Sequence, residues 1–268
     1  MNFLKVTFIF FSVSTVNAQV TQQWVARYNG PGNGRDYARA IAVDDAGNVY
    51  ITGESSGSGT GLDYCTIKYN SSGVQQWVAR YNGPGNARDY AQAITVDREG
   101  NVYVTGSSSG GNSYDDYATI KYGPDGEELW AARFNGTGNW HDRAFSLAVD
   151  DSGNVYVTGF SYSDITSEDF VTIKYNAQGA EQWVARYNGS ANTYDQGLFV
   201  NADLMDNVYV TGWATSRGSG IDFLTLRYNS SGQQQWAQLY NGPGGGADNP
   251  SGGAVDPPGV GTGVYIVG

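Results

Sequence analysis

The chain has little of the chemistry on which most catalytic and disulfide-stabilised proteins depend. Its 268 residues include one cysteine and one histidine. The single thiol, Cys65, excludes an intramolecular disulfide, and a chain of this length can bury enough core to fold without one. The lone His141 has neither a second histidine with which to hold a metal nor an obvious nucleophile beside it. We therefore predict no catalytic residues, no metal site, no cofactor and no enzymatic activity.

Positive charge is also scarce. The chain has 15 Lys and Arg residues against 26 Asp and Glu residues, which gives a net charge of −11. A surface of this sign repels nucleic acid phosphates and anionic lipid, so both are disfavoured as partners.

Long apolar runs are missing too. The most apolar stretch, Val6 to Val16, has about 11 residues and is too short to span a bilayer. It follows Lys5 and ends in Val16-Asn17-Ala18, which places small residues where a signal peptidase cleaves. We predict a signal peptide over residues 1–18, an exported repeat domain over residues 19–268, and no membrane insertion.

What the chain does contain is a strict repeat. Five tryptophans are spaced 53 residues apart, and each begins a close copy of the phrase Trp-Val-Ala-Arg-Tyr-Asn-Gly: Trp24, Trp77, Trp130, Trp183 and Trp236. A fixed period of this length indicates one supersecondary unit that buries its apolar faces against its neighbours.

Each unit is predicted to form four antiparallel strands. In the second unit, residues 93–97 and 102–106 alternate in period two around a Gly-containing turn, and residues 117–122 and 129–134 follow in the same way. Four strands in about 50 residues, repeated head to tail, are typical of a β-propeller blade. We predict an all-β propeller.

The repeated phrases resemble a known family. Asp150 to Gly159, Asp169 to Tyr175 and Gln182 to Gly189 are similar to the bacterial beta-propeller repeat called SBBP, and the resemblance covers residues 20–268. It implies secreted or surface proteins, often with seven blades and with no common enzymatic activity.

The blade count departs from that pattern. We expect four complete blades and an incomplete fifth one, with an isolated outer strand at residues 23–29. Either the ring stays open or the chain is a fragment of a larger propeller, and unpaired strand edges favour a fragment.

One acidic column precedes the inner strands: Asp36, Asp89, Asp142, Asp195 and Asp248. These carboxylates could form a ring that binds a hard cation such as Ca²⁺, or each could accept backbone N–H bonds within its own loop. A residue present in every copy is needed by every copy, which favours the structural role.

Two further acidic columns recur. The column at the inner hairpin, Asp44, Asp97, Asp150, Asp203 and Asp256, lacks the spacing of a calcium loop and is interpreted as turn chemistry. The column of Asp63, Asp116, Asp169 and Asp222 is followed five residues later by Lys68, Lys121, Lys174 and Arg227. We expect these acids and bases to form ladders between neighbouring strands or blades.

The tryptophans and their neighbouring arginines could form a carbohydrate surface, because sugar rings stack on aromatic faces. Packing between blades is the alternative that we favour, since blade faces are buried against one another. Cys65 aligns with Ala118, Val171 and Leu224 and is expected to be a small buried hydrophobe.

Recognition is expected at the rim where the copies differ, because loops that diverge on a constant scaffold commonly carry binding residues. Five side chains in these variable loops are the candidate anchors: Trp140, His141, Tyr162, Tyr194 and Trp213. Loops that drift without constraint are the alternative. The sequence thus favours a non-enzymatic secreted or cell-surface scaffold whose partner is a protein or a glycan. A lectin-like carbohydrate-binding propeller is the alternative function.

Overall fold

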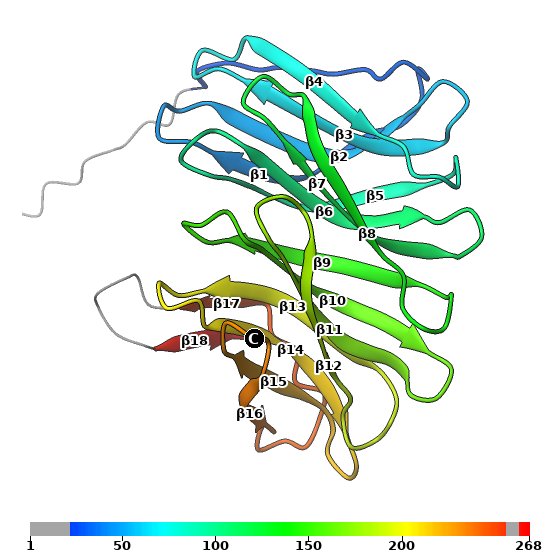
Figure 1. The fold of residues 1–268 in the computed structure, drawn as a ribbon, viewed down its shortest axis with the longest axis vertical. Coiled ribbons are helices and arrows are strands. Elements are labelled where there is room, and N and C mark those ends of the chain that lie inside the picture. The colour runs from blue at the N-terminus through cyan, green and yellow to red at the C-terminus, as the bar shows by residue number, and fades with distance from the viewer. Residues whose placement is uncertain (1–21, 256–262) are drawn as a thin grey trace, which may run out of the picture.

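The computed structural model describes residues 22–255 and 263–268, and the predicted signal peptide, residues 1–18, lies outside them. Every helix or strand in this part of the chain is a β-strand, and Figure 1 shows the strands grouped into successive twisted sheets. Four sheets have four strands each and a fifth has two.

The first two sheets are called blade 1 and blade 2. Blade 1 consists of β1 (Asp36–Val43), β2 (Val49–Ser56), β3 (Leu62–Tyr69) and β4 (Gln75–Tyr81). Blade 2 consists of β5 (Asp89–Val96), β6 (Val102–Ser109), β7 (Asp115–Tyr122) and β8 (Glu128–Phe134).

The remaining sheets repeat the pattern. Blade 3 consists of β9 (Asp142–Val149), β10 (Val155–Ser163), β11 (Ser167–Tyr175) and β12 (Glu181–Tyr187). Blade 4 consists of β13 (Asp195–Ala202), β14 (Val208–Ser216), β15 (Gly220–Tyr228) and β16 (Gln234–Tyr240). The final pair is β17 (Gly252–Val255) and β18 (Val264–Val267).

Strands follow chain order within every blade, and each neighbouring pair is antiparallel, as in β5–β6, β6–β7 and β7–β8. The first strands of successive blades contact one another: β1 with β5, β5 with β9, β9 with β13, and β13 with β17. This is the layout of propeller blades around an axis, and it confirms the predicted all-β fold of four-stranded blades. The sheets do not close into a ring, and blade 1 and blade 4 lie at opposite ends of Figure 1.

The strands extend further toward the variable rim than the sequence pattern predicts. β6 continues past the expected residues 102–106 to Ser109, with Ser107 opposite Tyr117 and Ser108 opposite Asp116. These serines and glycines carry no period-two apolar signal, but their backbone groups still complete the ladder. Tyr162 and Trp213, which we expected in loops, therefore lie in β10 and β14.

The prediction of one outer strand is wrong. Residues 23–29 were expected to form an outer strand, but the structure assigns no strand there. An outer strand needs a third strand of its own blade to pair with, and none precedes this segment within the described residues. Instead, the segment packs on blade 1, where Trp24 and Tyr28 cover the cluster of Cys65, Ile67 and Tyr69.

The core lies between blades rather than inside any one of them. Tyr50 of blade 1 packs with Val102, Val104 and Ile120 of blade 2, and all four are fully buried. Burying each such side chain contributes roughly 1.5–3 kcal/mol, so every blade depends on its neighbour for its stability. The buried Cys65 agrees with its prediction as a small hydrophobe.

The repeated tryptophan joins consecutive blades. Trp77 of blade 1 lies between the rings of Tyr50 in its own blade and Tyr122 in blade 2, at centroid distances of 6.2 and 6.3 Å. The Trp130 and Trp183 indoles donate to the backbone carbonyls of Ala177 and Ser230 in the blades that follow. The predicted packing between blades is therefore confirmed.

Candidate functional site

The carboxylates of the first acidic column accept hydrogen bonds from backbone groups of their own loops. The carboxylates of Asp89, Asp142 and Asp195 are fully buried, and each accepts a backbone N–H from a glycine six residues earlier, at 2.9, 2.7 and 2.6 Å. A second amide, twenty residues later, donates to the other oxygen, as Thr215 does to Asp195 at 2.8 Å. Burial raises the pKa of Asp195 to about 6 despite these bonds. The carboxylates therefore fix the loop to the blade, as the structural interpretation predicts.

The second column closes the inner hairpins. Asp44 accepts the backbone N–H of Asn48 at 2.8 Å, the Asn48 side-chain amide at 2.7 Å and the Tyr50 hydroxyl at 2.9 Å. Burial acts to raise the pKa of Asp44, but the Asn48 and Tyr50 bonds outweigh it and the pKa is lowered. The same bonds recur at Asp97, Asp150 and Asp203, whereas Asp256 lies outside the described residues.

The third column pairs with a different partner from the one expected. Asp116 lies 2.8 Å from Arg133 on the neighbouring outer strand, and its side chain is only 7% exposed. Lys121, the predicted partner, places its ammonium 5.0 Å from the centre of the Tyr103 ring. Arg80 with Asp63 and Arg186 with Asp169 repeat the pair. Arg80, Arg133 and Arg186 are thus held in ion pairs rather than presented to a sugar.

Three of the five predicted rim anchors come together. The Trp140 ring stacks on the Tyr114 ring, with 4.7 Å between the ring centroids and an angle of 8° between the planes. It also contacts the Tyr162 ring, at a centroid distance of 5.7 Å. Tyr114 in turn contacts the His141 ring at 4.8 Å. We call Tyr114, Trp140, His141 and Tyr162 the aromatic cluster.

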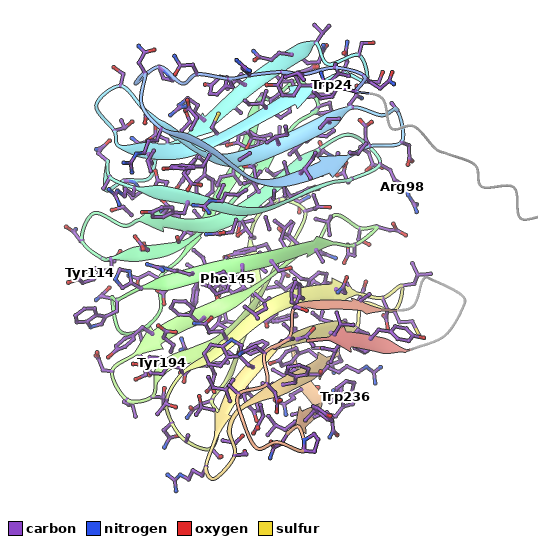
Figure 2. The ribbon with its side chains drawn as sticks, turned by 180° about the vertical axis from the view of Figure 1, so that it is seen from behind. Trp24, Arg98, Tyr114, Phe145, Tyr194 and Trp236 are labelled. Atoms are coloured by element: carbon purple, nitrogen blue, oxygen red, sulfur yellow. The ribbon has the colours of Figure 1, made fainter. Side chains whose placement is uncertain are left out.

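The other two anchors lie apart from this cluster. Tyr194 is 55% exposed in the loop before β13, and Trp213 is partly buried in β14 opposite Gln196. Figure 2 shows Tyr114 and Tyr194 toward the same end of the blades, with Arg98 of the uniform hairpins at the opposite end.

A cavity of about 680 Å³ opens beside the aromatic cluster, and we call it the basic pocket. Arg39 of β1, Arg88 of the loop before β5 and Arg143 of β9 all line it, so three blades each contribute a guanidinium. His141 is the one predicted anchor in its wall. Phe145 also lines the pocket, and Figure 2 shows it between the two ends of the molecule.

Two carboxylates form ion pairs with two of the three arginines. Asp115 lies 3.1 Å from His141 Nδ1 and 3.2 Å from an Arg143 nitrogen. Glu54, only 1% exposed, binds Arg39 through both carboxylate oxygens. Arg88 is exposed and donates to the Tyr90 hydroxyl at 3.5 Å.

Apart from His141, the pocket residues were not predicted from the sequence, although the sequence carries a signal for two of the charged residues. At period 53, Arg143 aligns with Tyr37, Tyr90 and Gln196, and the buried Glu54 aligns with Ser107, Phe160 and Trp213. Arg143 is the only arginine in its column, and Glu54 is the only carboxylate in its column.

No group of three or more His, Cys, Asp or Glu side chains among the described residues is arranged to hold a metal ion. Likewise, this part of the chain contains no helix with the length and apolar character of a membrane span.

Comparison with known proteins supports the repeat. Two segments, residues 23–59 and 76–115, match the family model described as beta-propeller repeat (SBBP), which confirms the resemblance for those segments. An uncharacterized WD repeat-containing protein of Acanthamoeba polyphaga mimivirus is 26% identical over 210 residues, or 72% of this chain. The chain spans only 12% of the length of that curated relative.

Solved structures share the fold at low identity. An alpha-L-arabinofuranosidase from Fusarium graminearum aligns with a TM-score of 0.52 and 15% identity, over 89% of this chain and 77% of the other. A gluconolactonase from Xanthomonas campestris aligns with a TM-score of 0.45 and 13% identity, over 86% of this chain and 69% of that one. At 15% identity, the likeness to the arabinofuranosidase shows the fold alone.

Proposed function

We propose that the chain is a non-enzymatic binding propeller of an exported protein and that it holds an anionic ligand in the basic pocket. One observation carries the proposal: Arg39, Arg88 and Arg143, from three blades, line one cavity of about 680 Å³ on a chain whose net charge is −11. Guanidinium groups bind carboxylates and phosphates through two parallel hydrogen bonds, so a cavity lined by them suits an anion.

The local charge balance supports an anion as ligand. Three guanidiniums are offset by two carboxylates, Glu54 and Asp115, which leaves an excess of one positive charge. Arg88 supplies this excess, because no acidic side chain among the described residues forms a salt bridge with it. A positive site on a negative surface concentrates anions where the rest of the molecule repels them.

Binding without catalysis is the better supported reading of these residues. Asp115 is the sole carboxylate among the residues found in the pocket wall, and it already contacts His141 and Arg143. Hydrolysis of a glycoside commonly requires a pair of carboxylates across the bond, one acid and one base or nucleophile. The buried Asp89, Asp142 and Asp195 are engaged with backbone amides.

A lectin with one shallow site in every blade has less support. The aromatic cluster involves blades 2 and 3 only, and its Tyr114 and Trp140 rings already stack on each other. The repeated tryptophans pack between blades. A single site at the variable rim fits this distribution, and we assign the export of the protein to the predicted leader at residues 1–18.

The test is calorimetric titration of the leader-free chain with small anionic probes: trigalacturonic acid, triglutamate and inorganic phosphate. We expect at least one probe to bind, and we expect its affinity to fall as the salt concentration is raised. Arg88→Glu should weaken it by about tenfold or more. Arg35→Glu is the matched control, because Arg35 occupies the same column in blade 1, is exposed and lies outside the pocket. The proposal would be overturned if none of the three probes bound, or if both variants lost the same amount of affinity.

A further inference from the structure

We propose that the ligand of the basic pocket is a carboxylate-bearing saccharide, with a uronic acid carboxylate on Arg88 and Arg143 and its ring against Phe145. The inference rests on the proposed function and narrows it to one chemical class. It is drawn from three properties of the pocket wall: its neutral polar side chains, its aromatic surface and its net charge.

The neutral polar side chains suit hydroxyl groups. Gln92, Ser107 and Ser109 line the pocket together with Tyr90, and all four belong to β5 and β6 of blade 2. Amide and hydroxyl groups both donate and accept hydrogen bonds, as sugar hydroxyls do. A wall of this kind complements a ligand with many hydroxyls better than one whose polar groups are all acidic.

Phe145 supplies the aromatic surface. It lines the pocket from β9, and its ring centroid lies 5.8 Å from that of Phe160. Phe160 therefore supports the Phe145 ring from within the blade. The same column holds Arg39, Gln92 and Leu198 in the other blades, so the aromatic ring occurs in one blade only. Its position in a polar cavity suits the apolar C–H face of a sugar ring, since binding sites commonly combine an aromatic wall with a few polar groups.

The net charge favours a singly charged group. An excess of one guanidinium balances one carboxylate, whereas a phosphate near −2 would also meet the Asp115 carboxylate in the same wall. An acidic peptide would leave its backbone amides to find partners among a few hydroxyls. The volume of about 680 Å³ lies within the range of pockets that enclose small ligands and accommodates a short oligosaccharide.

The experiment compares matched probes on the leader-free chain. Trigalacturonic acid carries the carboxylates, and its methyl ester keeps the ring and hydroxyls but loses the charge. We expect the acid to bind, and we expect the ester to bind about tenfold more weakly or not at all. Triglutamate and inorganic phosphate test the other sources of anionic charge.

Two variants test the contact with the sugar. Phe145→Leu introduces the residue type that blade 4 has at this position, and it should weaken trigalacturonate about tenfold while leaving triglutamate unaffected. If this variant fails to fold, Gln92→Ala gives a second reading, because that side chain lines the pocket without belonging to a core cluster. Arg88→Glu should abolish binding of the acid, and Arg35→Glu should not.

The outcomes separate the two proposals. If triglutamate or phosphate binds in an Arg88-dependent way and trigalacturonate does not, the saccharide assignment is overturned and the anion-binding function stands. Equal affinity for the acid and its ester overturns the role of the carboxylate. Unchanged trigalacturonate affinity in both Phe145→Leu and Gln92→Ala overturns the contact with the sugar. No binding of any anionic probe overturns both proposals.

Discussion

The indole N–H of Trp77 in blade 1 donates to the backbone carbonyl of Pro124 in blade 2, 2.9 Å away. Two residues beyond Pro124, Gly126 has φ of +88°, and a Cβ built on it would lie 2.7 Å from the Trp77 ring. The ring can therefore reach the hairpin only because this position has no side chain. The same relationship joins Trp24 to Gly73, Trp130 to Gly179 and Trp183 to Gly232.

We predict that Gly126→Ala lowers the free energy of unfolding by about 2–4 kcal/mol, since it combines an unfavourable φ with a collision against Trp77. Urea denaturation measures it. Gly100→Ala is the control, because Gly100 has φ of +83° but its nearest contact is 3.7 Å away in Pro124. It should lose only about 1 kcal/mol. Equal losses would show that the contact with the tryptophan contributes nothing.

Leu239 in blade 4 stands where Arg80, Arg133 and Arg186 form ion pairs in the other blades. Its would-be partner Asp222 is 2% exposed and accepts a hydrogen bond from Ser219 at 2.6 Å. We predict that Leu239→Arg raises the free energy of unfolding by about 1 kcal/mol, because it supplies the missing cation at a residue that is already 39% exposed.

The matched control for that substitution is Gln235→Arg. It adds the same charge to the exposed strand β16 at a position outside the arginine column. Because the chain is acidic, any added cation reduces general repulsion slightly. Thermal unfolding of both variants separates the two effects, and an equal gain in both would rule out a specific pair with Asp222.

Asp195 predicts a dependence of stability on pH. Burial raises its folded-state pKa to about 6, above the value of about 3.9 in an unfolded chain. The folded state therefore binds this proton more tightly. The associated stability is fully present below pH 4 and is lost as pH rises through 6. The loss should be on the order of 1–2 kcal/mol, seen as a falling urea midpoint.

Asp195→Asn should flatten this slope between pH 4 and 6, even though it weakens the loop at every pH by removing an acceptor. Asp203→Asn serves as the contrast. Burial acts to raise the pKa of Asp203, but its bonds to Asn207 outweigh burial and lower it. That group therefore supports stability above pH 4 and loses it as pH falls. A slope between pH 4 and 6 that is unchanged in Asp195→Asn would contradict the assignment.

Cys65 reports on the segment that precedes blade 1. The thiol is 6% exposed, and burial raises its pKa, so alkylation of the folded chain should be slow. We predict that Trp24→Ala speeds alkylation several-fold at a given pH, because Trp24 packs over the cluster that contains Cys65. Val25→Ala, at a residue 62% exposed, should leave the rate unchanged. Mass spectrometry after timed labelling measures both rates.

The repeat made the blades predictable because identical residues meet at every interface. Trp77 finds Tyr122 and Gly126 for the same reason that Trp130 finds Tyr175 and Gly179. The strand ends were less predictable. Ser107 and Ser108 belong to β6 through their backbone bonds, and their small polar side chains carry no alternating apolar signal.

The basic pocket could not be predicted from the repeat. Arg39, Arg88 and Arg143 fall in three different columns, and among these only the Arg88 column holds arginine in another blade, at Arg35. Successive blades bring equivalent positions to the cavity, since Arg39, Gln92 and Phe145 share one column and all line it. Arg88 and His141 share a second column, and Tyr90 and Arg143 a third. The period shows which positions are equivalent, whereas the charge of the pocket comes from side chains that differ between the blades.

The contact between each tryptophan and the glycine 49 residues later also bears on how such a chain grows. A segment that runs from one tryptophan to the next contains the tryptophan of one blade and the glycine turn of the following blade, against which that tryptophan packs. Duplication of 53 residues therefore reproduces both halves of an interface at once, and no compensating substitution is required. Selection can then act on the residues that line the axis while the joints between blades stay the same.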